Sequence, residues 1–424
     1  MIIPMNQYIR SLTLTLSIFI PLTFINVSES SELSEAKITL NDLYLFDEIS
    51  SIDVSHSAKQ IAYSVSSVDE KKDRYRNDIW LLDVNKNKKK VLIKGRPWVG
   101  KTKFSPNDTL LGYLAPGRGQ YSEYQQIWTI NTNYRTKRQL TKLKANINDF
   151  EWSPDGTQMI LVADSISVDK KTKSSVQTQK PIVIDRYYFK EDGKEFLGDE
   201  RQHLHLLDIK SRTTKQLTKG TSNEILPSWS PDSKKIAYVT KTGEMDRTNN
   251  YDVYVLEIDS TNNPIQLTTN LGADSSSSRP QWSPDGKKIA YLHGGDPALL
   301  WYALQELAVI DLDTKINSIL TKELDRNVSS PQWSDDGQSI YFVIEDNMKS
   351  QLAKYSLTNQ KIKKITPSNY YISGWAKNYV VRNGKIGLIL SNTNSPDEVY
   401  FYDENSLSQQ SHHNSELLSS RKIL

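Results

Sequence analysis

The stretch Trp282–Gly286, Trp-Ser-Pro-Asp-Gly, is followed at once by Lys-Lys-Ile-Ala-Tyr. Ser283 opens a turn, and its hydroxyl can bind a nearby backbone N–H. Proline presets φ at the second position, aspartate binds its own backbone at the third, and Gly286 accepts a left-handed conformation at the fourth. The aromatic residue before the turn anchors one strand in a core, and Ile-Ala-Tyr starts the next. The stretch therefore predicts a tight connection between two antiparallel strands.

This turn recurs along the chain with variations. Successive copies begin roughly 50 residues apart, except for one interval of roughly 77 residues, and such a period is typical of β-propeller blades. The other copies are Phe104-Ser-Pro-Asn-Asp108, Trp152-Ser-Pro-Asp-Gly156, Trp229-Ser-Pro-Asp-Ser233 and Trp333-Ser-Asp-Asp-Gly337.

A second, independent repeat is short, apolar and rich in β-branched or aromatic residues, as buried strands are. Its seven copies begin at Ile79, Ile127, Leu204, Val253, Leu307, Leu352 and Val399. A third repeat resembles Gln-Leu-Thr, predicts a short outer strand, and begins at Gln139, Gln216, Gln266, Ile319 and Lys364.

The three repeats keep a fixed order, which predicts an all-β propeller of four-stranded blades. The second repeat gives seven blades, and six is the alternative count if an end unit is incomplete. Both end units are atypical, as expected in a closed or capped array. The first carries Val54–Tyr63 in place of the turn, and the last carries Gly374–Asn378.

Composition excludes several classes of function. A net charge of +3 without a basic face rich in stacking aromatics argues against nucleic-acid binding. The chain has no cysteine, so disulfides, thiol catalysis and Cys-based metal sites are excluded. His203 and His205 alternate on one strand face and could share a ligand, but no third ligand is evident and ordinary strand residues are the favoured interpretation.

The N-terminus differs in kind from the rest. Arg10 precedes an apolar run from Leu12 to Phe24, and small and polar residues follow. This pattern is typical of a secretory signal peptide, and an uncleaved anchor helix is the alternative. We therefore expect a signal peptide over residues 1–30 and an exported protein, periplasmic or secreted, with no stable membrane span after cleavage.

The chain contains a match to a phosphate-binding loop and a partial match to a serine-hydrolase motif, and neither has the structural context that the motif needs. Gly95–Thr102 matches the phosphate-loop pattern GxxxxGK[ST], which needs a helix after it, but a strand and turn of the repeat follow instead. No Gly-x-Ser-x-Gly elbow and no βα alternation occurs; Gly220–Glu224 holds half the motif, and Ser411–Asn414 lies at the tail. The sequence therefore predicts no catalytic, cofactor-binding or metal-binding residues, no cofactor and no nucleotide.

Two elaborations exceed what a blade needs. The long interval predicts an insertion in blade three over about residues 164–202, with a strand from Pro181 to Lys190 and a turn at Glu191–Gly193. It is either a long hairpin packed on its own blade or an arm that reaches a partner. Asp296–Leu304 is apolar, and exposed apolar elaborations tend to mark a docking face.

These repeats resemble the propellers of TolB-type periplasmic proteins and of the prolyl oligopeptidase family of serine peptidases. The acylaminoacyl-peptidase or dipeptidyl-aminopeptidase branch is favoured by six segments, and the resemblance covers roughly residues 38–420. The segments are Pro181–Gly193 with His203–Asp208, Leu324–Val328 with Pro331–Trp333, Ser395–Tyr400 and His412–Leu418. In that family the propeller caps an α/β-hydrolase domain and limits access to small peptides.

The resemblance implies a propeller over residues 31–410 and a tail, residues 411–424, that is similar to a linker into a hydrolase domain. The family's nucleophile, acid and base have no matching positions here. We therefore expect the non-catalytic propeller of an exported peptidase, truncated or split from its hydrolase domain, which gates peptide access and docks on that domain. The alternative is a stand-alone TolB-like scaffold that binds an envelope protein.

Overall fold

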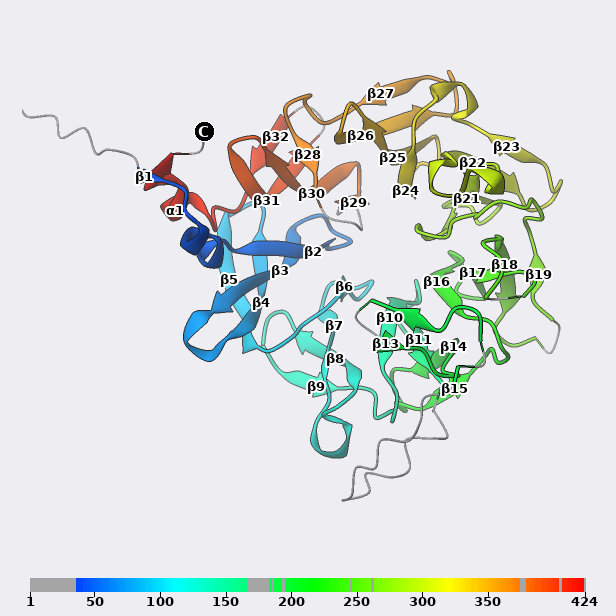
Figure 1. Cartoon of the computed structure of the whole chain (residues 1–424), viewed down its shortest axis with the longest axis horizontal. Coiled ribbons are helices and arrows are strands. Elements are labelled where there is room, and N and C mark those ends of the chain that lie inside the picture. Colours follow the sequence, from blue (N-terminus) through cyan, green and yellow to red (C-terminus); the bar gives the residue numbers. More distant parts are fainter. Residues whose placement is uncertain are drawn as a thin grey trace, which may run out of the picture.

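The computed structural model describes residues 36–165, 183–184, 186–192, 195–244, 246–260, 263–373, 379–403 and 406–422. Seven antiparallel sheets are arranged in a ring around one axis (Figure 1). Six have four strands in sequence order, and the seventh has five because two short strands share its inner position. The predicted all-β propeller with seven blades is therefore confirmed.

Each blade runs from an inner strand at the axis to an outer strand at the rim. Blade one consists of β2 (Glu48–Val54), β3 (Gln60–Asp69), β4 (Arg74–Asp83) and β5 (Lys88–Arg96). Blade two consists of β6 (Thr102–Phe104), β7 (Leu110–Pro116), β8 (Gln125–Asn131) and β9 (Lys137–Gln139). Blade three consists of β10 (Ile147–Trp152), β11 (Gln158–Asp164), β14 (Gln202–Asp208) and β15 (Thr214–Gln216). Blade four consists of β16 (Glu224–Trp229), β17 (Lys235–Lys241), β18 (Tyr251–Glu257) and β19 (Ile265–Gln266). Blade five consists of β20 (Gln281–Trp282), β21 (Lys288–Gly294), β22 (Gln305–Asp311) and β23 (Asn317–Ile319). Blade six consists of β24 (Val328–Trp333), β25 (Ser339–Asp346), β26 (Lys349–Ser356) and β27 (Ile362–Lys364). Blade seven consists of β28 (Tyr371–Ile372), β29 (Tyr379–Arg382), β30 (Lys385–Asn392), β31 (Ser395–Asp403) and β32 (Ser406–Gln409).

The Ser-Pro-Asp-Gly turn joins the first two strands of a blade as predicted. At Ser283–Gly286, the Ser283 hydroxyl donates to Asp285 Oδ1 (2.5 Å) and accepts from the Lys288 backbone N–H (2.9 Å). Gly286 has φ of +71°, and its N–H donates to the Ser283 carbonyl. The degraded copies force other residues into the left-handed region, namely Ala58, Asp108 and Ser233. The turn is thus held by its own side chains before any contact with a neighbour.

The turn tryptophans also join neighbouring blades. Each indole nitrogen donates to a carbonyl on the inner strand of the preceding blade, at the residue just before that blade's own turn aromatic. Four such bonds of 2.9–3.2 Å link Trp152, Trp229, Trp282 and Trp333 to Lys103, Glu151, Ser228 and Gln281, respectively.

The Gln-Leu-Thr repeat closes the outer edge of most blades. Its hydroxyl accepts a hydrogen bond of 2.7–3.1 Å from the first core residue of the third strand in blades two to seven. The residues concerned are Thr141, Thr218, Thr268, Thr321, Thr366 and Ser411. A buried backbone N–H is costly if unpaired, so these hydroxyls extend each ladder where the outer strand ends.

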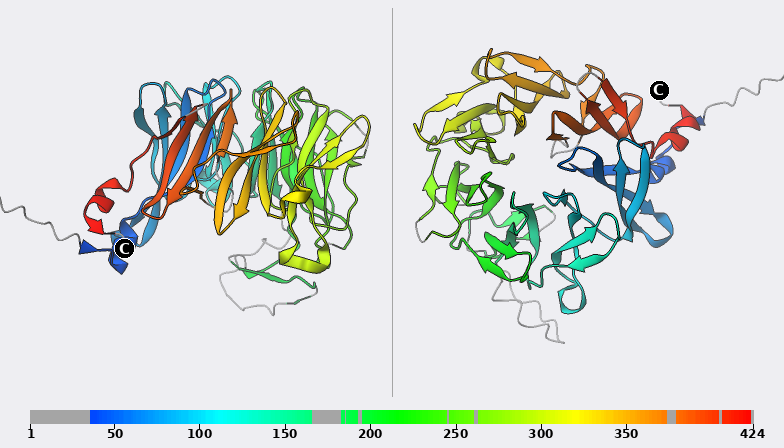
Figure 2. Two further views of the ribbon diagram at one scale, coloured as in Figure 1. Left: turned by 90° about the horizontal axis from the view of Figure 1, so that it is seen from above. Right: turned by 180° about the vertical axis from the view of Figure 1, so that it is seen from behind.

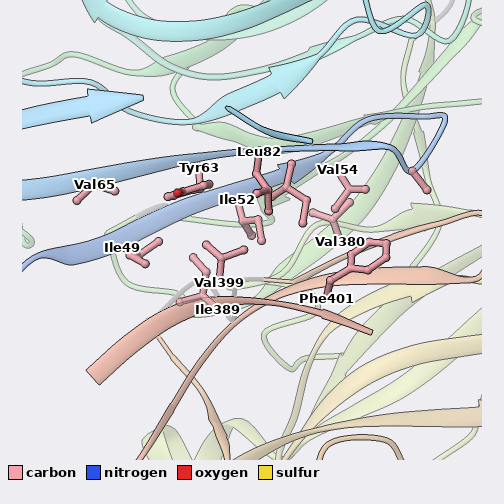
Figure 3. Close-up of a cluster of buried hydrophobic side chains, with 12 residues drawn as sticks. Ile49, Ile52, Val54, Tyr63, Val65, Leu82, Val380, Ile389, Val399 and Phe401 are labelled. Carbon is pink, nitrogen blue, oxygen red and sulfur yellow. The ribbon is translucent and has the colours of Figure 1, made fainter. Parts of the chain in front are cut away.

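The core is divided into seven hydrophobic clusters, one between each pair of neighbouring blades. The cluster that closes the ring joins blade one to blade seven (Figure 3). Ile52, Val54 and Tyr63 of blade one pack there against Val380 and Phe401 of blade seven. No described strand is exchanged between the two blades, so side chains rather than a shared ladder hold the ring closed.

Polar contacts at the chain ends reinforce this closure. Asn414 accepts from the Asp47 N–H (2.8 Å) and donates to the Asp47 carbonyl (2.9 Å). Beyond it, α1 (Ser415–Ser419) leads to β33 (Arg421–Lys422), which pairs in parallel with β1 (Ala36–Lys37). Arg421 also binds Asp42 of the 3₁₀ helix η1 (Leu40–Leu45) at 3.0 Å. The two ends of the described chain thus meet at one edge of the disc (Figure 1).

The two faces of the disc carry different connections. The turns between first and second strands define the turn face. The loops between second and third strands lie at the opposite end of each blade and define the loop face, where both chain ends and two elaborations also lie (Figure 2). The elaborations are the hairpin β12 (Lys190–Glu191) and β13 (Glu195–Phe196), and the 3₁₀ helix η4 (Pro297–Tyr302). Of the strand predicted from Pro181 to Lys190, the described residues are in strand conformation only at Lys190, and residues 186–188 form bends.

Two predicted features lie wholly outside the described residues, and the blade-three insertion lies partly outside them. Gly374–Asn378 lies outside the described residues, as do residues 1–35, which include the predicted signal peptide. Among the described residues, no helix has the length and apolar character needed to cross a membrane.

Candidate functional site: the axial channel

The inner strands carry irregularities that aim side chains toward the axis. The strand register shifts between Ile49 and Ser51, between Ile147 and Asp149, between Ile225 and Ser228, and between Ser329 and Gln332. Leu226 and Ser330 have positive φ values within two of these shifts. Bulges re-aim side chains and are frequent beside functional sites, so the inner strands are built for more than pairing.

Blade five departs furthest from the regular pattern. Its inner strand β20 has two residues, and the segment before it, Asp274–Pro280, is a loop that we call the blade-five loop. The start of this loop is fixed by Ser275, whose N–H donates to the Leu292 carbonyl (2.8 Å) and whose hydroxyl accepts from the Leu292 N–H (2.9 Å). Close packing beside it requires glycine at 272, since a Cβ atom there would lie 2.3 Å from the Gly294 oxygen.

A channel of about 1130 Å³ runs among the inner strands. All seven blades contribute to its wall, for example through Ser51, Lys101, Asp149, Ser228, Arg279, Gln332 and Val380. The wall is polar over much of its area, and its charged side chains come mainly from blades two, three and five. The channel is a large concave feature with charged groups in its wall, and such a feature is the default candidate for a binding site.

Four charged side chains, Lys101, Asp149, Glu151 and Arg279, form what we call the channel cluster. Lys101 Nζ lies 2.5 Å from Asp149 Oδ1 and 2.8 Å from Glu151 Oε1. Arg279 Nη2 lies 2.5 Å from Asp149 Oδ2 and 3.4 Å from Glu151 Oε1. Lys103 adds longer contacts of 3.8 Å to Glu151 and to the buried Asp53. Arg279 belongs to blade five and Asp149 to blade three, so this pair bypasses blade four.

Burial and ion pairing act in opposite directions on the cluster. Burial alone would raise the pKa of Asp149, but the Arg279 and Lys101 cations outweigh it and lower that pKa. The pKa of Glu151 is likewise lowered, by Lys101, Lys103 and Arg279 against the effect of burial. For Lys101, burial dominates and lowers the pKa despite the two carboxylates. Both carboxylates are therefore ionised at neutral pH and paired with cations.

The sequence analysis did not identify this cluster. A signal was present, because the residues one and three positions before the turn aromatic lie on one face of the inner strand. Lys101 and Lys103 precede Phe104 in this way, and Asp149 and Glu151 precede Trp152. Combining that alternation with the expected ring would have placed these side chains toward the axis.

The two strand histidines are structural. His203 is buried and its Nδ1 lies 2.8 Å from Glu224 Oε2, which also accepts from the Thr218 hydroxyl. Burial, together with the nearby His203, lowers the pKa of His205 to about 4. No group of three metal-ligating side chains occurs among the described residues. His203 therefore links blade three to the inner strand of blade four.

The phosphate-loop match and the tail serine both lie within the blade repeat. Gly95 and Arg96 are the last two residues of β5, and Thr102 is the first residue of β6. The phosphate-loop match therefore lies between two strands, and no helix follows it. Ser411 is fully buried, accepts from the Val399 N–H and donates to Glu398. Its hydroxyl is thus engaged in closing blade seven.

The blade-three insertion contacts blade four. Arg186 forms an ion pair of 2.5 Å with Asp246 in the β17–β18 loop, and the Arg247 guanidinium lies 5.1 Å from the Tyr187 ring centroid. Tyr187 and Tyr188 remain 70% and 51% exposed, although they are large and partly apolar. The described part of the insertion therefore packs beyond its own blade and still presents aromatic side chains to solvent.

Comparisons with known proteins agree with this architecture. No protein-family model matches the sequence. The chain is 25% identical over 224 residues to the uncharacterized peptidase YuxL of Bacillus subtilis, covering 52% of this chain and 34% of that protein. It is 25% identical over 387 residues to dipeptidyl-peptidase 5 of Porphyromonas endodontalis, covering 85% of this chain and 54% of the relative. The chain thus spans about half or less of the length of these relatives.

Solved structures share the fold. The acylaminoacyl peptidase of Pyrococcus horikoshii matches with a TM-score of 0.70 at 14% identity, over 90% of this chain and 55% of that one. The β-propeller domain of the Trilobed protease from Pyrococcus furiosus, described as having an open velcro topology, matches with a TM-score of 0.61 at 15% identity, over 87% and 97% of the two chains. This chain is a seven-bladed β-propeller that resembles the propeller domain of acylaminoacyl and prolyl peptidases and has dipeptidyl-peptidase 5 homologues.

Proposed function

We propose that this propeller docks on an α/β-hydrolase domain of the prolyl oligopeptidase type and limits which peptides reach it. The hydrolase domain is either part of the same polypeptide or a separate chain. The observation that carries the proposal is the axial channel, whose width is restricted by Arg279 reaching from blade five to Asp149 of blade three. The names of the curated relatives, a peptidase and a dipeptidyl-peptidase, support peptide-bond cleavage as the reaction class.

The docking part of the proposal rests on the loop face. Exposed apolar side chains gather on elements of this face, and a surface of that kind favours a protein contact. They include Leu40 and Leu43 of η1, Tyr187 and Tyr188 of the insertion, and Tyr302 of η4. Export through the predicted signal peptide over residues 1–30 completes the proposal.

A labelling experiment on the natural protein tests it. The protein is affinity-tagged in its own host, purified under mild conditions and treated with a fluorophosphonate probe, which labels active serine hydrolases. We expect a labelled species in the same polypeptide or in a stoichiometric complex, with cleavage of dipeptide substrates but not of folded proteins. Absence of any labelled hydrolase, with the propeller folded, would overturn the proposal.

A matched pair of variants tests the docking face. Replacing Tyr187 and Tyr188 together with serine removes exposed aromatic area from the loop face. Tyr134→Ser removes a tyrosine that is 82% exposed in the β8–β9 hairpin on the turn face. We expect the double variant to weaken association or hydrolase activity and Tyr134→Ser to leave both unchanged. Equal effects of the two changes would contradict docking through the loop face.

The second candidate is a stand-alone scaffold that binds an envelope protein. The same exposed aromatic side chains favour it, because they suit any protein partner. The labelling experiment separates the two functions. A stoichiometric complex with a protein that does not react with fluorophosphonate, lost on replacing Tyr187 and Tyr188, supports the scaffold and opposes the peptidase.

A further inference from the structure

Arg279 joins parts of the ring that are not neighbours. The other inter-blade hydrogen bonds described above link adjacent blades, whereas Arg279 reaches past blade four to Asp149, 130 residues away in sequence. Its side chain is 16% exposed, and that of Asp149 is 17% exposed. The pair is therefore largely removed from bulk water, yet it faces the channel rather than a packed core.

The segment that carries Arg279 is weakly held by its own blade. The β20–β21 ladder contains two pairs, Gln281 with Ala290 and Trp282 with Ile289. Between the anchored Ser275 and this ladder, the blade-five loop makes a bond from the Ser278 N–H to the Ser275 carbonyl (3.2 Å), and the Ser278 hydroxyl accepts from the Ser330 N–H of blade six (3.0 Å). The ion pairs of Arg279 thus supply much of the force that holds the loop across the channel.

Two buried polar groups of residues that line the channel, Arg279 Nη1 and the Ser228 hydroxyl, have no hydrogen-bond partner among the described residues. An unpaired buried donor is costly, so the closed arrangement is stabilised by charge pairing while its hydrogen bonding is incomplete. Such a balance allows the loop to move when the charge pairing weakens.

We propose that Arg279 is a gating residue, and that its ion pairs with Asp149 and Glu151 hold the blade-five loop across the axial channel and restrict passage of solutes between the two faces. Loss of either charge frees the loop and opens the channel. The inference rests on the proposed function and deepens it, because it names the residue that controls access through the channel.

The absence of native cysteine provides a direct test. Ser228→Cys places a thiol in the channel wall, and Ser211→Cys places one on the exposed turn between β14 and β15. The labelling rate is measured with two neutral maleimides, one small and one bulky, so that salt does not act through the charge of the reagent. The ratio of the two thiols' rates reports access to the channel and corrects for reagent chemistry.

Arg279→Gln in the Ser228→Cys background should raise the bulky reagent's rate at least about fivefold, since loss of a partly buried ion pair shifts a closed–open equilibrium by roughly that factor. Salt at 1 M should change these rates little, because partly buried ion pairs are screened much less than exposed ones. Arg326→Gln, which removes an arginine paired with Asp346 on the exposed surface, is the matched control and should change neither rate.

Equal labelling rates with and without Arg279, in variants of equal thermal stability, would overturn the proposal. Should Arg279→Gln fail to fold, Asp149→Asn in the Ser228→Cys background decides the question, because it removes the partner charge. A bulky reagent's rate that Asp149→Asn leaves unchanged also overturns the proposal. None of these readouts uses peptidase activity, so their failure is distinct from failure of the proposed function.

Discussion

Gly387 on β30 of blade seven lies against Val54 on β2 of blade one, so close that a Cβ atom at position 387 would stand 2.5 Å from Val54 Cγ2. Both residues belong to the surface that closes the ring, which the clustered side chains of Figure 3 hold together. Glycine is therefore required there by the approach of two blades.

Gly387→Ala should lower the free energy of unfolding by about 1–3 kcal/mol, the usual effect of overpacking a well-filled core. Urea denaturation measures the change. Gly198→Ala is the control, because its Cβ atom would meet nothing within 4 Å. Adding Val54→Ala to Gly387→Ala should cost less than the sum of the two single changes, and strict additivity would contradict the proposed contact.

Trp282→Phe should destabilise the protein by about 1–2 kcal/mol, because the Ser228 carbonyl loses the indole donor at 3.2 Å in a buried position. Trp80→Phe is a matched control, since Trp80 Nε1 is buried and finds no acceptor among the described residues. That change should be neutral or stabilising. Thermal unfolding of both variants measures the difference, and equal losses would mean that ring size rather than the hydrogen bond matters.

The buried Asp274 should make the protein less stable as pH rises. Burial raises the pKa of Asp274 to about 6, only partly offset by the Gly294 N–H that binds its Oδ1. The folded state then binds more protons than the unfolded state between about pH 4 and 6, so the stability contributed by the neutral form is lost as pH rises through that window.

Asp274→Asn keeps the Oδ1 acceptor and removes the charge. It should raise the melting temperature at pH 7.5 by about 1 °C for each kcal/mol gained, given the size of the chain, with a smaller gain at pH 4.5. Asp285→Asn tests the opposite sign, because the Ser283 hydroxyl and the Lys287 N–H lower the pKa of Asp285. Its carboxylate stabilises the fold at neutral pH and loses that effect in acid. Equal responses of the two variants would contradict the assignment.

The 424-residue polypeptide by itself should not hydrolyse acylated or N-terminal dipeptide chromogenic substrates. Ser411 lies beside two histidines in sequence, but its hydroxyl accepts from the Val399 N–H and donates to Glu398. Incubation of the purified chain with such substrates and with a fluorophosphonate probe measures this directly. Turnover that survives Ser411→Ala would show a nucleophile elsewhere, and turnover lost with that change would show that Ser411 itself reacts.

The repeat made most of the fold predictable, because each blade is specified by residues close in sequence. The turn at Trp282–Gly286 dictates its own φ values, and the hydroxyl of Thr268 closes the outer edge of its blade locally. The channel cluster was not predictable in the same way. Arg279 and Asp149 meet only because the ring brings blades three and five to one axis, and no local pattern records that distance.

The insertion shows the same limit. Its hairpin was expected from the turn residues, but the direction in which it packs depends on Asp246, a residue in the next blade. Packing of Gly387 against Val54 likewise depends on closure of the whole ring. Sequence patterns specify a blade, and contacts between blades depend on geometry that accumulates over many residues.

The ring closes without a described strand shared between blades one and seven, and this has a consequence for how the chain folds. Strands within a blade are consecutive in sequence, so their pairing costs little loop entropy and can proceed as the chain is synthesised. The bonds between Asp47 and Asn414 span 367 residues and must form after all seven blades exist. We therefore expect the junction of blades one and seven to form last, and its backbone amides to exchange hydrogen before those of the interior blades.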